Sequence, residues 1–133
     1  MQALQAQLHP HFLFNCLNTI RSLTPASAES ARLAVTLLAD LLRACLTEGK
    51  RPTLPLAREL ELTRLYISME RLRFGEGLQL DEQIEPSALP LHVPSLMLLT
   101  LAENAVKHGL LHDPENSVFR VSGSIKSEHL CLK

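Results

Sequence analysis

Two histidines flank a proline near the start of the chain, in the stretch Leu8-His9-Pro10-His11-Phe12. A neutral imidazole is a competent nucleophile near pH 7, and one ring nitrogen can attack while a hydrogen bond holds the other. Gln7 and Asn15 stand one helical turn from His11 on either side, so either side chain could supply that bond. No carboxylate follows His11, so a general base for this imidazole must come from elsewhere in the molecule.

An apolar residue at every fourth position predicts a helix over residues 2–22 that carries this stretch. Pro10 breaks the pattern of hydrogen bonds, at a cost of about 3 kcal/mol if it lies inside the helix. Two interpretations stay open: a helix kinked beside His11, or a helix that begins at Pro10. Between Gln2 and Ile20 no residue is charged, which is typical of a surface that is partly covered.

The composition of the 133-residue chain limits the classes of function. A net charge of -1 and the lack of a basic run give no support for nucleic-acid binding. The three cysteines are odd in number and lie far apart in apolar surroundings, so we expect reduced thiols and a cytosolic setting. No apolar run is long enough to span a bilayer, and no signal peptide precedes the first helix. A membrane association would therefore depend on segments outside this chain.

The second predicted helix runs from Thr24 or Ser27 to about Glu48 and has a broad apolar arc. Its members are Ala31, Ala34, Val35, Leu38, Leu41, Leu42 and Cys45. Two antiparallel helices cannot bury arcs this wide on each other, so the pattern predicts dimerisation into a four-helix bundle. The alternative is that the arc packs against the rest of the same chain. Gly49-Lys50-Arg51-Pro52 is the expected boundary of this unit.

Further helices and strands follow this boundary. A third helix, opening at Thr53 or Pro55 and ending near Phe74 before Gly75, has apolar stripes on two sides. We expect its intervening charged residues at the surface: Glu59, Glu61, Arg64, Glu70, Arg71 and Arg73. Residues 78–85 alternate as a strand, and residues 117–126 and 128–133 are expected to form a strand pair.

A fourth helix is expected to open at Pro94 and to end at His108, before Gly109. One half is apolar, with Leu98, Leu99, Leu101, Ala102, Ala105 and Val106. The other half carries Glu103, Asn104, Lys107 and His108.

Three stretches in this order resemble the LytS-type sensor histidine kinases. The stretch from Gln7 to Asn15 is similar to the family's phosphoacceptor motif, Gln-x-x-Pro-His-Phe-x-Phe-Asn. The second stretch resembles the helix that leads into the ATPase domain, and it contains Glu59-Leu60, Tyr66-Ile67 and the residues from Glu70 to Phe74. The stretch from Leu101 to Gly109, after Pro94, resembles the N-box of that domain.

The resemblance implies a role for each matching residue. His11 is the implied phosphoacceptor for ATP and is favoured over His9, whose position varies in the family. Asn104 is the implied ligand of the Mg²⁺ that bridges the ATP phosphates, because an amide oxygen is a hard donor. Lys107 and His108 would offset phosphate charge. Glu103 would orient the metal site or a water, although an ion pair with Lys107 is the plainer interpretation.

The implied fold is α+β: a dimeric helical hairpin over residues 1–50, then the first half of a GHKL-type α/β-sandwich ATPase domain over residues 51–133. None of the five glycines follows an aspartate as in the family's Asp-x-Gly-x-Gly loop, so we expect a truncated kinase that binds ATP weakly. The implied activity is autophosphorylation of His11 and transfer to an aspartate of a response regulator, usually of the LytTR type. The implied location is the cytoplasm, on the inner face of the cell membrane.

Two other classes of function remain. The chain could be a non-catalytic dimerisation and phosphoacceptor module that receives phosphate from another protein. It could also bind a metal through its six histidines. However, no His-Glu-x-x-His or paired-cysteine spacing occurs, and Gly109 is expected to end the helix between His108 and His112. A label appearing on His11 only when an intact kinase is added would favour the module.

Overall fold

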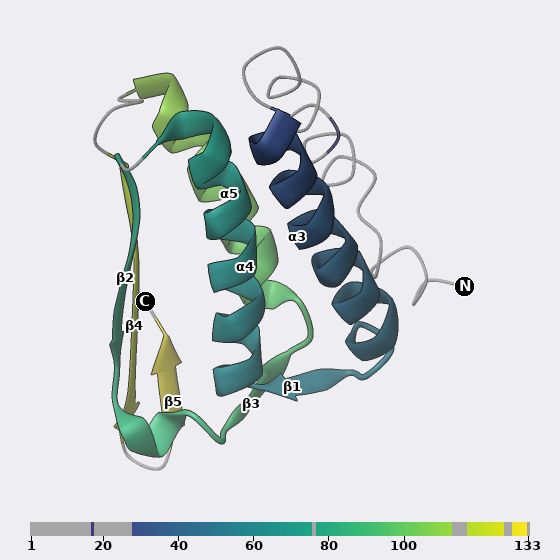
Figure 1. Cartoon of the computed structure of the whole chain (residues 1–133). Helices are drawn as coiled ribbons and strands as arrows, with labels where there is room; N and C mark the ends of the chain where they lie inside the picture. The colour runs from purple at the N-terminus through teal and green to yellow at the C-terminus, as the bar shows by residue number, and fades with distance from the viewer. Residues whose placement is uncertain (1–16, 18–27, 76, 113–116, 127–128, 133) are drawn as a thin grey trace.

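The computed structural model describes residues 17, 28–75, 77–112, 117–126 and 129–132. Helices α4 (Leu56–Phe74) and α5 (Met97–His112) lie between a β-sheet on one side and helix α3 (Ala28–Glu48) on the other (Figure 1). This mixture of helices and sheet confirms the α+β class. The predicted helix over residues 2–22, with Gln7, His11 and Asn15, lies outside the described residues apart from Leu17.

Helix α3 confirms the second predicted helix and buries one stripe of its apolar arc. The buried residues are Ala34, Leu38, Leu41 and Cys45, which recur every three or four residues. The last three of them join α4 in one hydrophobic cluster, so packing within the chain covers this stripe. Val35 belongs to the predicted arc and lies beside this stripe, and its side chain is 51% exposed in the single chain. Its burial in a dimer stays a prediction.

Helix α4 confirms the third predicted helix. It begins after Pro55 and ends at Phe74, before Gly75. The φ of Gly75, 80°, lies in the left-handed region that favours glycine, and its N–H donates to the Arg71 carbonyl at 2.8 Å. The expectation that Glu59 and Glu70 lie at the surface is wrong, because both are buried. Their positions fall on the same helix face as Leu56, Leu60 and Ile67, which are buried as well.

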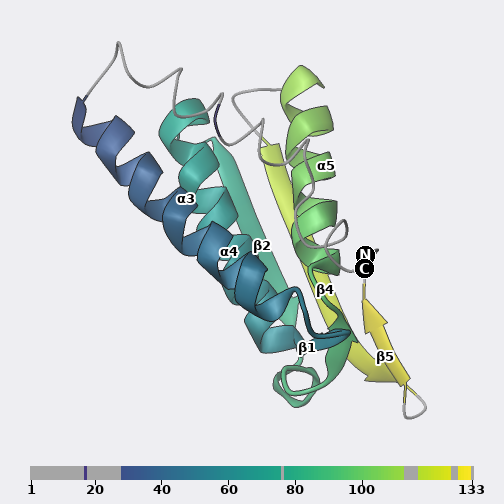
Figure 2. The ribbon, with the colours of Figure 1, turned by 90° about the vertical axis from the view of Figure 1, so that its right-hand side faces the viewer.

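The main sheet has the order β2 (Leu78–Ile84), β4 (Ser117–Lys126) and β5 (His129–Leu132) (Figure 2). The predicted strand at 78–85 and the predicted C-terminal strand pair are confirmed, with β4 and β5 antiparallel. Strands β2 and β4 are parallel, with Leu80 opposite Phe119. Parallel strands need a crossover connection, and α5 supplies it here.

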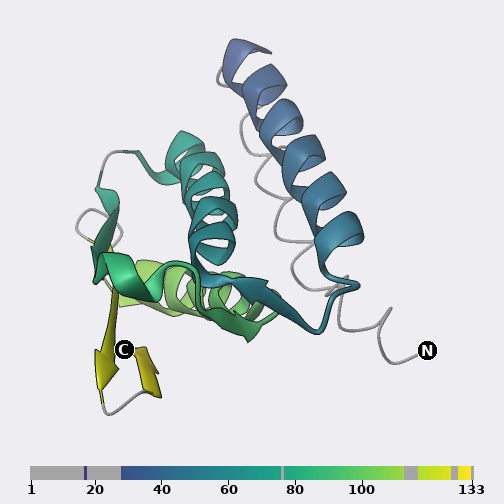
Figure 3. The ribbon, with the colours of Figure 1, turned by 90° about the horizontal axis from the view of Figure 1, so that it is seen from below.

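The crossover from β2 to β4 also contains two short elements before α5. A 3₁₀ turn (Pro86–Ala88) is followed by β3 (His92–Pro94), which pairs antiparallel with β1 (Thr53–Pro55). Strand β1 leads from the end of α3 to the start of α4, as the view from below shows (Figure 3). The β1–β3 ribbon therefore ties the entry of α4 to the entry of α5.

Both predicted ends of the fourth helix are wrong. Pro94 ends β3, and α5 begins at Met97 after Leu96, whose φ is 63°. The helix also continues through Gly109 to His112. A glycine inside a helix costs only about 1 kcal/mol, which the residues on either side can offset. In the sequence, the stronger helix breaker is Pro114, two residues beyond the observed end.

Two hydrophobic clusters hold these layers together. One joins α3, α4 and α5 through side chains such as Leu41, Tyr66 and Val106. The other lies between the two inner helices and the sheet and includes Leu60, Leu98 and Val121. Within the ranges described above, no helix combines the length and the apolar character needed to cross a bilayer.

Candidate functional site

Helix α5 presents an exposed face that carries two of the predicted site residues. Asn104 and His108 follow Leu101 at spacings of three and seven residues, so the three share one side of the helix, and all three are exposed. Leu101, expected on the apolar half of the helix, is 50% exposed and lies on this face instead. Lys107 is also exposed and lies at the edge of this face.

Glu103 does not join this face. Its side chain is 3% exposed, so its predicted place on the polar half of the helix is wrong. The reason lies in the helix period, since Glu103 follows the buried Leu99 by four residues and precedes the buried Val106 by three. The structure therefore brings Asn104 and His108 together and separates Glu103 from them.

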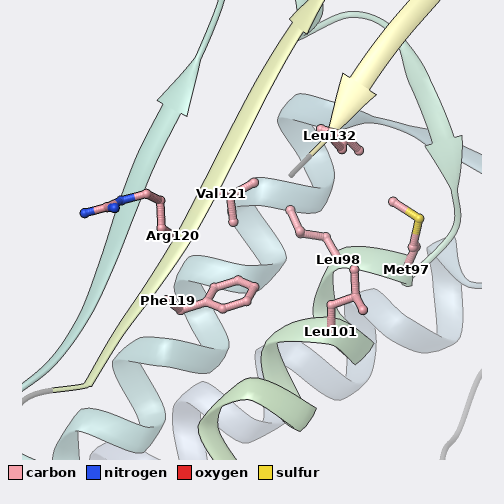
Figure 4. Close-up of a pocket in the computed structure, with 7 residues that line it drawn as sticks. All are labelled: Met97, Leu98, Leu101, Phe119, Arg120, Val121 and Leu132. Carbon is pink, nitrogen blue, oxygen red and sulfur yellow. The ribbon is translucent and has the colours of Figure 1, made fainter. Parts of the chain in front are cut away.

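An apolar pocket of about 300 Å³ opens beside the N-terminal half of this face (Figure 4). It is lined by Met97, Leu98, Leu101, Phe119, Arg120, Val121 and Leu132. Phe119 and the leucines of α5 point toward one another, whereas the Arg120 side chain points away and donates to Asp81 Oδ2 at 2.6 Å. Asn104 lies one turn beyond Leu101 on the same side of α5, so a polar segment follows the apolar pocket along the helix.

The start of α5 is held by a carboxylate from α4. The Leu96 N–H donates to Glu59 Oε2 at 2.8 Å, and the Leu98 N–H donates to Glu59 Oε1 at 3.0 Å. The first N–H groups of a helix have no partner within the helix, so this side chain satisfies two donors that burial would otherwise leave unpaired. Burial raises the pKa of Glu59 above its ordinary value, while the two N–H bonds oppose that rise.

The sequence pattern did not predict that Glu59 caps α5. Its spacing indicated burial, because Glu59 follows Leu56 by three residues and precedes Thr63 by four. These residues share the face of α4 that carries an apolar stripe. A carboxylate on such a face needs a buried partner. The sequence does not show that the partner is the backbone of a helix 37 residues further along.

The ends of α3 and α4 are joined across the predicted domain boundary at residues 50 and 51. Arg58 Nε donates to both carboxylate oxygens of Glu48, at 2.8 and 2.6 Å, and Arg58 Nη1 donates to Glu61 at 2.6 Å. Glu48 and Arg58 also line an open polar hollow of about 280 Å³ with residues of α3. The two oxygens of Glu48 share one N–H group of Arg58, and the ion pair links the last turn of α3 to the first turn of α4.

Two histidines of α5 bear on the alternative of a metal site. His108 and His112 lie on one continuous helix, contrary to the expected break at Gly109. Among the residues that the structure describes, no group of three or more His, Cys, Asp or Glu side chains could hold a metal ion. His11 and its neighbours Gln7 and Asn15 lie outside those residues.

A family model described as Histidine kinase matches residues 1–78, a segment that includes His11. The chain is 31% identical over 132 residues to the Sensor protein LytS of Staphylococcus haemolyticus, covering 99% of this chain and 23% of the relative. It is 34% identical over 130 residues to the Sensor protein LytS of Enterococcus faecalis, covering 98% and 22%. It is also 34% identical over 122 residues to the Sensor histidine kinase/phosphatase LytS of Staphylococcus aureus strain Mu50, covering 92% and 21%. The chain thus spans less than a quarter of the length of these relatives.

Proposed function

Because the chain belongs to the histidine kinase family and is of the LytS type, we propose that it serves a two-component sensor kinase as the segment that carries the phosphoacceptor and part of the ATP site. ATP phosphorylates His11, and the phosphoryl group then passes to an aspartate of a response regulator, of the LytTR type. The observation that carries this proposal is the exposed face of α5, where Asn104 and His108 stand side by side in a chain whose family match includes His11.

The exposed face of α5 has the chemistry that a magnesium nucleotide needs. Mg²⁺ prefers oxygen donors and keeps several waters, so one exposed amide oxygen from Asn104 suits it. Lys107 and His108 are exposed close by and would offset phosphate charge. Glu103 is buried, which favours an effect on the orientation of α5 over direct contact with the metal or a water. When bound, Mg-ATP supplies the phosphoryl group that the His11 imidazole accepts.

We also propose that the chain consists of two units. Residues 1–50 would form the dimerising phosphoacceptor hairpin, and residues 51–133 would form the first half of a GHKL-type ATPase domain. Two copies would associate through their hairpins into a four-helix bundle. The location would be the inner face of the cell membrane, reached through segments outside this chain, and no contact with nucleic acid is proposed.

Labelling by an intact LytS-type kinase tests His11 as the phosphoacceptor. The chain is incubated with the kinase and ATP labelled at the γ-phosphate, beside the variants His11→Gln and His9→Gln. We expect acid-labile label on the wild-type chain and on the His9 variant and none on the His11 variant. Label that remains in His11→Gln and disappears in His9→Gln would assign the phosphoacceptor to the other histidine.

A second candidate function is a phosphoacceptor module without kinase activity of its own. The extent of the family match favours it, because the matched residues 1–78 include His11 and stop before Asn104. The same labelling reaction without the added kinase separates the two functions. Label on His11 from ATP alone shows autonomous catalysis, whereas label only in the presence of the kinase shows the module.

Calorimetric titration with Mg-ATP tests the nucleotide site on α5 directly. We expect weak binding by the wild-type chain, and a loss of binding in Asn104→Ala because its Mg²⁺ ligand is removed. Ser68→Ala is a control for an exposed substitution on the neighbouring helix α4, and it should bind as the wild type does. Equal affinity in Asn104→Ala and in the wild type would remove Asn104 from the site.

A further inference from the structure

Glu59 is a buried acidic residue that the proposed chemistry does not use. The Glu59 side chain is fully buried on α4, and its two carboxylate oxygens accept the N–H groups of Leu96 and Leu98. A buried carboxylate is unfavourable unless charge-assisted bonds compensate for the lost water. It is most favourable at the N-terminus of a helix, where the backbone dipoles place partial positive charge.

We propose that Glu59 is a positioning residue for the Asn104 site, because its carboxylate fixes where α5 begins and thereby where Asn104 stands. The proposal deepens the proposed function and rests on it only in taking Asn104 as the residue that contacts the nucleotide. Glu59 itself touches neither nucleotide nor metal. Its effect reaches the site through the backbone of α5.

The segment entering α5 needs such a support. Leu96 has a φ of 63°, a left-handed conformation that a leucine adopts only where the surroundings hold it. Its N–H is bound by Glu59, and its carbonyl accepts the Thr100 N–H at 3.0 Å and the Thr100 hydroxyl at 2.8 Å. The turn that sets the direction of α5 is thus held on one side by α4 and on the other by the first turn of α5 itself.

The support on α4 is rigid. Leu56 and Leu60, one turn before and one residue after Glu59, are fully buried between the helices and the sheet. The Thr63 hydroxyl, also buried, donates to the Glu59 carbonyl at 2.8 Å. Glu59 therefore has little freedom to follow α5 if that helix shifts, and it acts as a fixed reference for the start of α5.

A displacement at the start of α5 is carried to Asn104. Leu98 and Asn104 are six residues apart on one continuous helix, which corresponds to about 9 Å along its axis. Over so short a length a helix behaves as a rigid rod. A small rotation at Leu98 therefore moves the amide of Asn104 relative to the pocket formed with β4.

The test compares Glu59→Gln with the control Glu61→Gln, which makes the same change at an exposed position of the same helix. Glutamine keeps the size of the side chain but offers one acceptor oxygen and turns an NH₂ group toward the second N–H. The complete chain is labelled for NMR, and spectra are recorded at a temperature where circular dichroism shows every variant folded. The readouts are the amide exchange rates of Leu96 and Leu98 and the side-chain amide signals of Asn104.

We expect at least about tenfold faster exchange at one or both of these amides in Glu59→Gln, as for loss of a charge-assisted bond, together with shifted Asn104 signals. Glu61→Gln should match the wild type in both readouts. A group that only stabilises the fold would lower the melting temperature and leave the Asn104 signals of the folded state unchanged, and that result would overturn the proposal. If Glu59→Gln does not fold, the amide exchange rates of the wild type test the proposal instead. Amides of Leu96 and Leu98 that exchange without protection would also overturn the proposal.

A titration of the same samples with Mg-ATP separates the two proposals. Weaker binding by Glu59→Gln than by Glu61→Gln supports both. If the wild-type chain shows no change with Mg-ATP, the nucleotide site is wrong, while the exchange rates and the Asn104 signals still decide whether Glu59 positions α5.

Discussion

At Glu59, one carboxylate is subject to two opposing effects. Burial raises the pKa of this group above the ordinary value of 4.5, and the N–H bonds from Leu98 and Leu96 oppose the rise without cancelling it. The folded chain therefore retains a proton at pH values where the unfolded chain has released it. The group thus helps α5 to start at a fixed place and at the same time reduces the free energy of unfolding at neutral pH relative to acid pH.

The sign of this effect gives a pH dependence. The stabilising contribution from the raised pKa is complete below the ordinary value of 4.5, and it is lost as the pH rises through the folded-state pKa. Glu59→Gln cannot titrate at this position. We expect the free energy of unfolding of the wild type, minus that of Glu59→Gln, to fall across this window and then to level off. Urea unfolding followed by circular dichroism between about pH 4 and pH 8 measures the difference, and a constant difference would contradict a raised pKa.

Cys45 is predicted to be chemically inert in the folded chain. Burial, reinforced by the charges of Glu59 and Glu48, raises the pKa of its thiol to about 11. Only the thiolate reacts, so at pH 8 about one molecule in a thousand carries the reactive form. With Cys16 and Cys131 replaced by serine, a thiol reagent should label the chain slowly in buffer and rapidly in urea. Labelling in buffer at the rate of free cysteine would show that this side chain is not buried.

At the scale of elements, helix α5 shows what a sequence can predict and what it cannot. Its existence and the exposure of Asn104, Lys107 and His108 follow from local periodicity, and both are confirmed. Its start is set by Glu59, which lies far away in sequence, and by the unusual backbone of Leu96, so no local pattern at Pro94 could give it. The expected stop at Gly109 failed because a single glycine is a weak helix breaker.

In the sheet as well, the features that depend on local contacts were predicted and those that depend on distant contacts were not. The alternation in β2 and the hairpin of β4 and β5 are local patterns and were predicted. The parallel pairing of β2 with β4 depends on a crossover of more than thirty residues, which no short-range signal specifies. The burial of Glu103 was within reach of helix periodicity, whereas the pocket beside Leu101 depends on the placement of β4 and β5.

The packing of α3 on α4 gives a stability prediction with a matched control. Leu41 is buried in the cluster shared with α4, whereas Leu33 on the same helix is exposed. Leu41→Ala should lower the free energy of unfolding by about 2–5 kcal/mol, and Leu33→Ala should change it by less than about 0.5 kcal/mol. Chemical denaturation measures both values. Equal effects of the two substitutions would mean that α3 does not pack on α4 in solution.

Chemical denaturation also tests whether the segments on either side of the proposed boundary at residues 50 and 51 unfold independently. If residues 28–48 pack on α4 as the Glu48–Arg58 contact indicates, α3 and α4 should unfold in one transition. Fluorescent probes placed on α3 and on β4 should then report the same midpoint. Separate midpoints would instead favour two independently stable units with their boundary near residues 50 and 51.

At the scale of the whole molecule, helix α3 lies on the opposite side of α4 and α5 from the sheet (Figure 1). Some of its large apolar side chains are exposed. Val35 and Leu46 are 51% and 44% exposed. Leu46 follows Val35 by eleven positions, about three helical turns, which places both on one flank of the helix beside the buried stripe. An apolar flank of this kind, on the helix that the proposed dimer uses, is the surface through which two copies should associate.

This flank gives the test of the homodimer. A charge introduced at Val35 would have to lose its water in the interface, whereas a charge at the neighbouring Thr36 would stay on the polar side of the helix. We therefore expect Val35→Glu to weaken self-association at least about tenfold, which corresponds to roughly 1.4 kcal/mol, and Thr36→Glu to leave it unchanged. Sedimentation equilibrium over a range of concentrations measures both constants, and circular dichroism checks that both variants keep the helix content of the wild type. A monomeric wild type would refute the homodimer, and equal association of the two variants would place its interface away from this flank of α3.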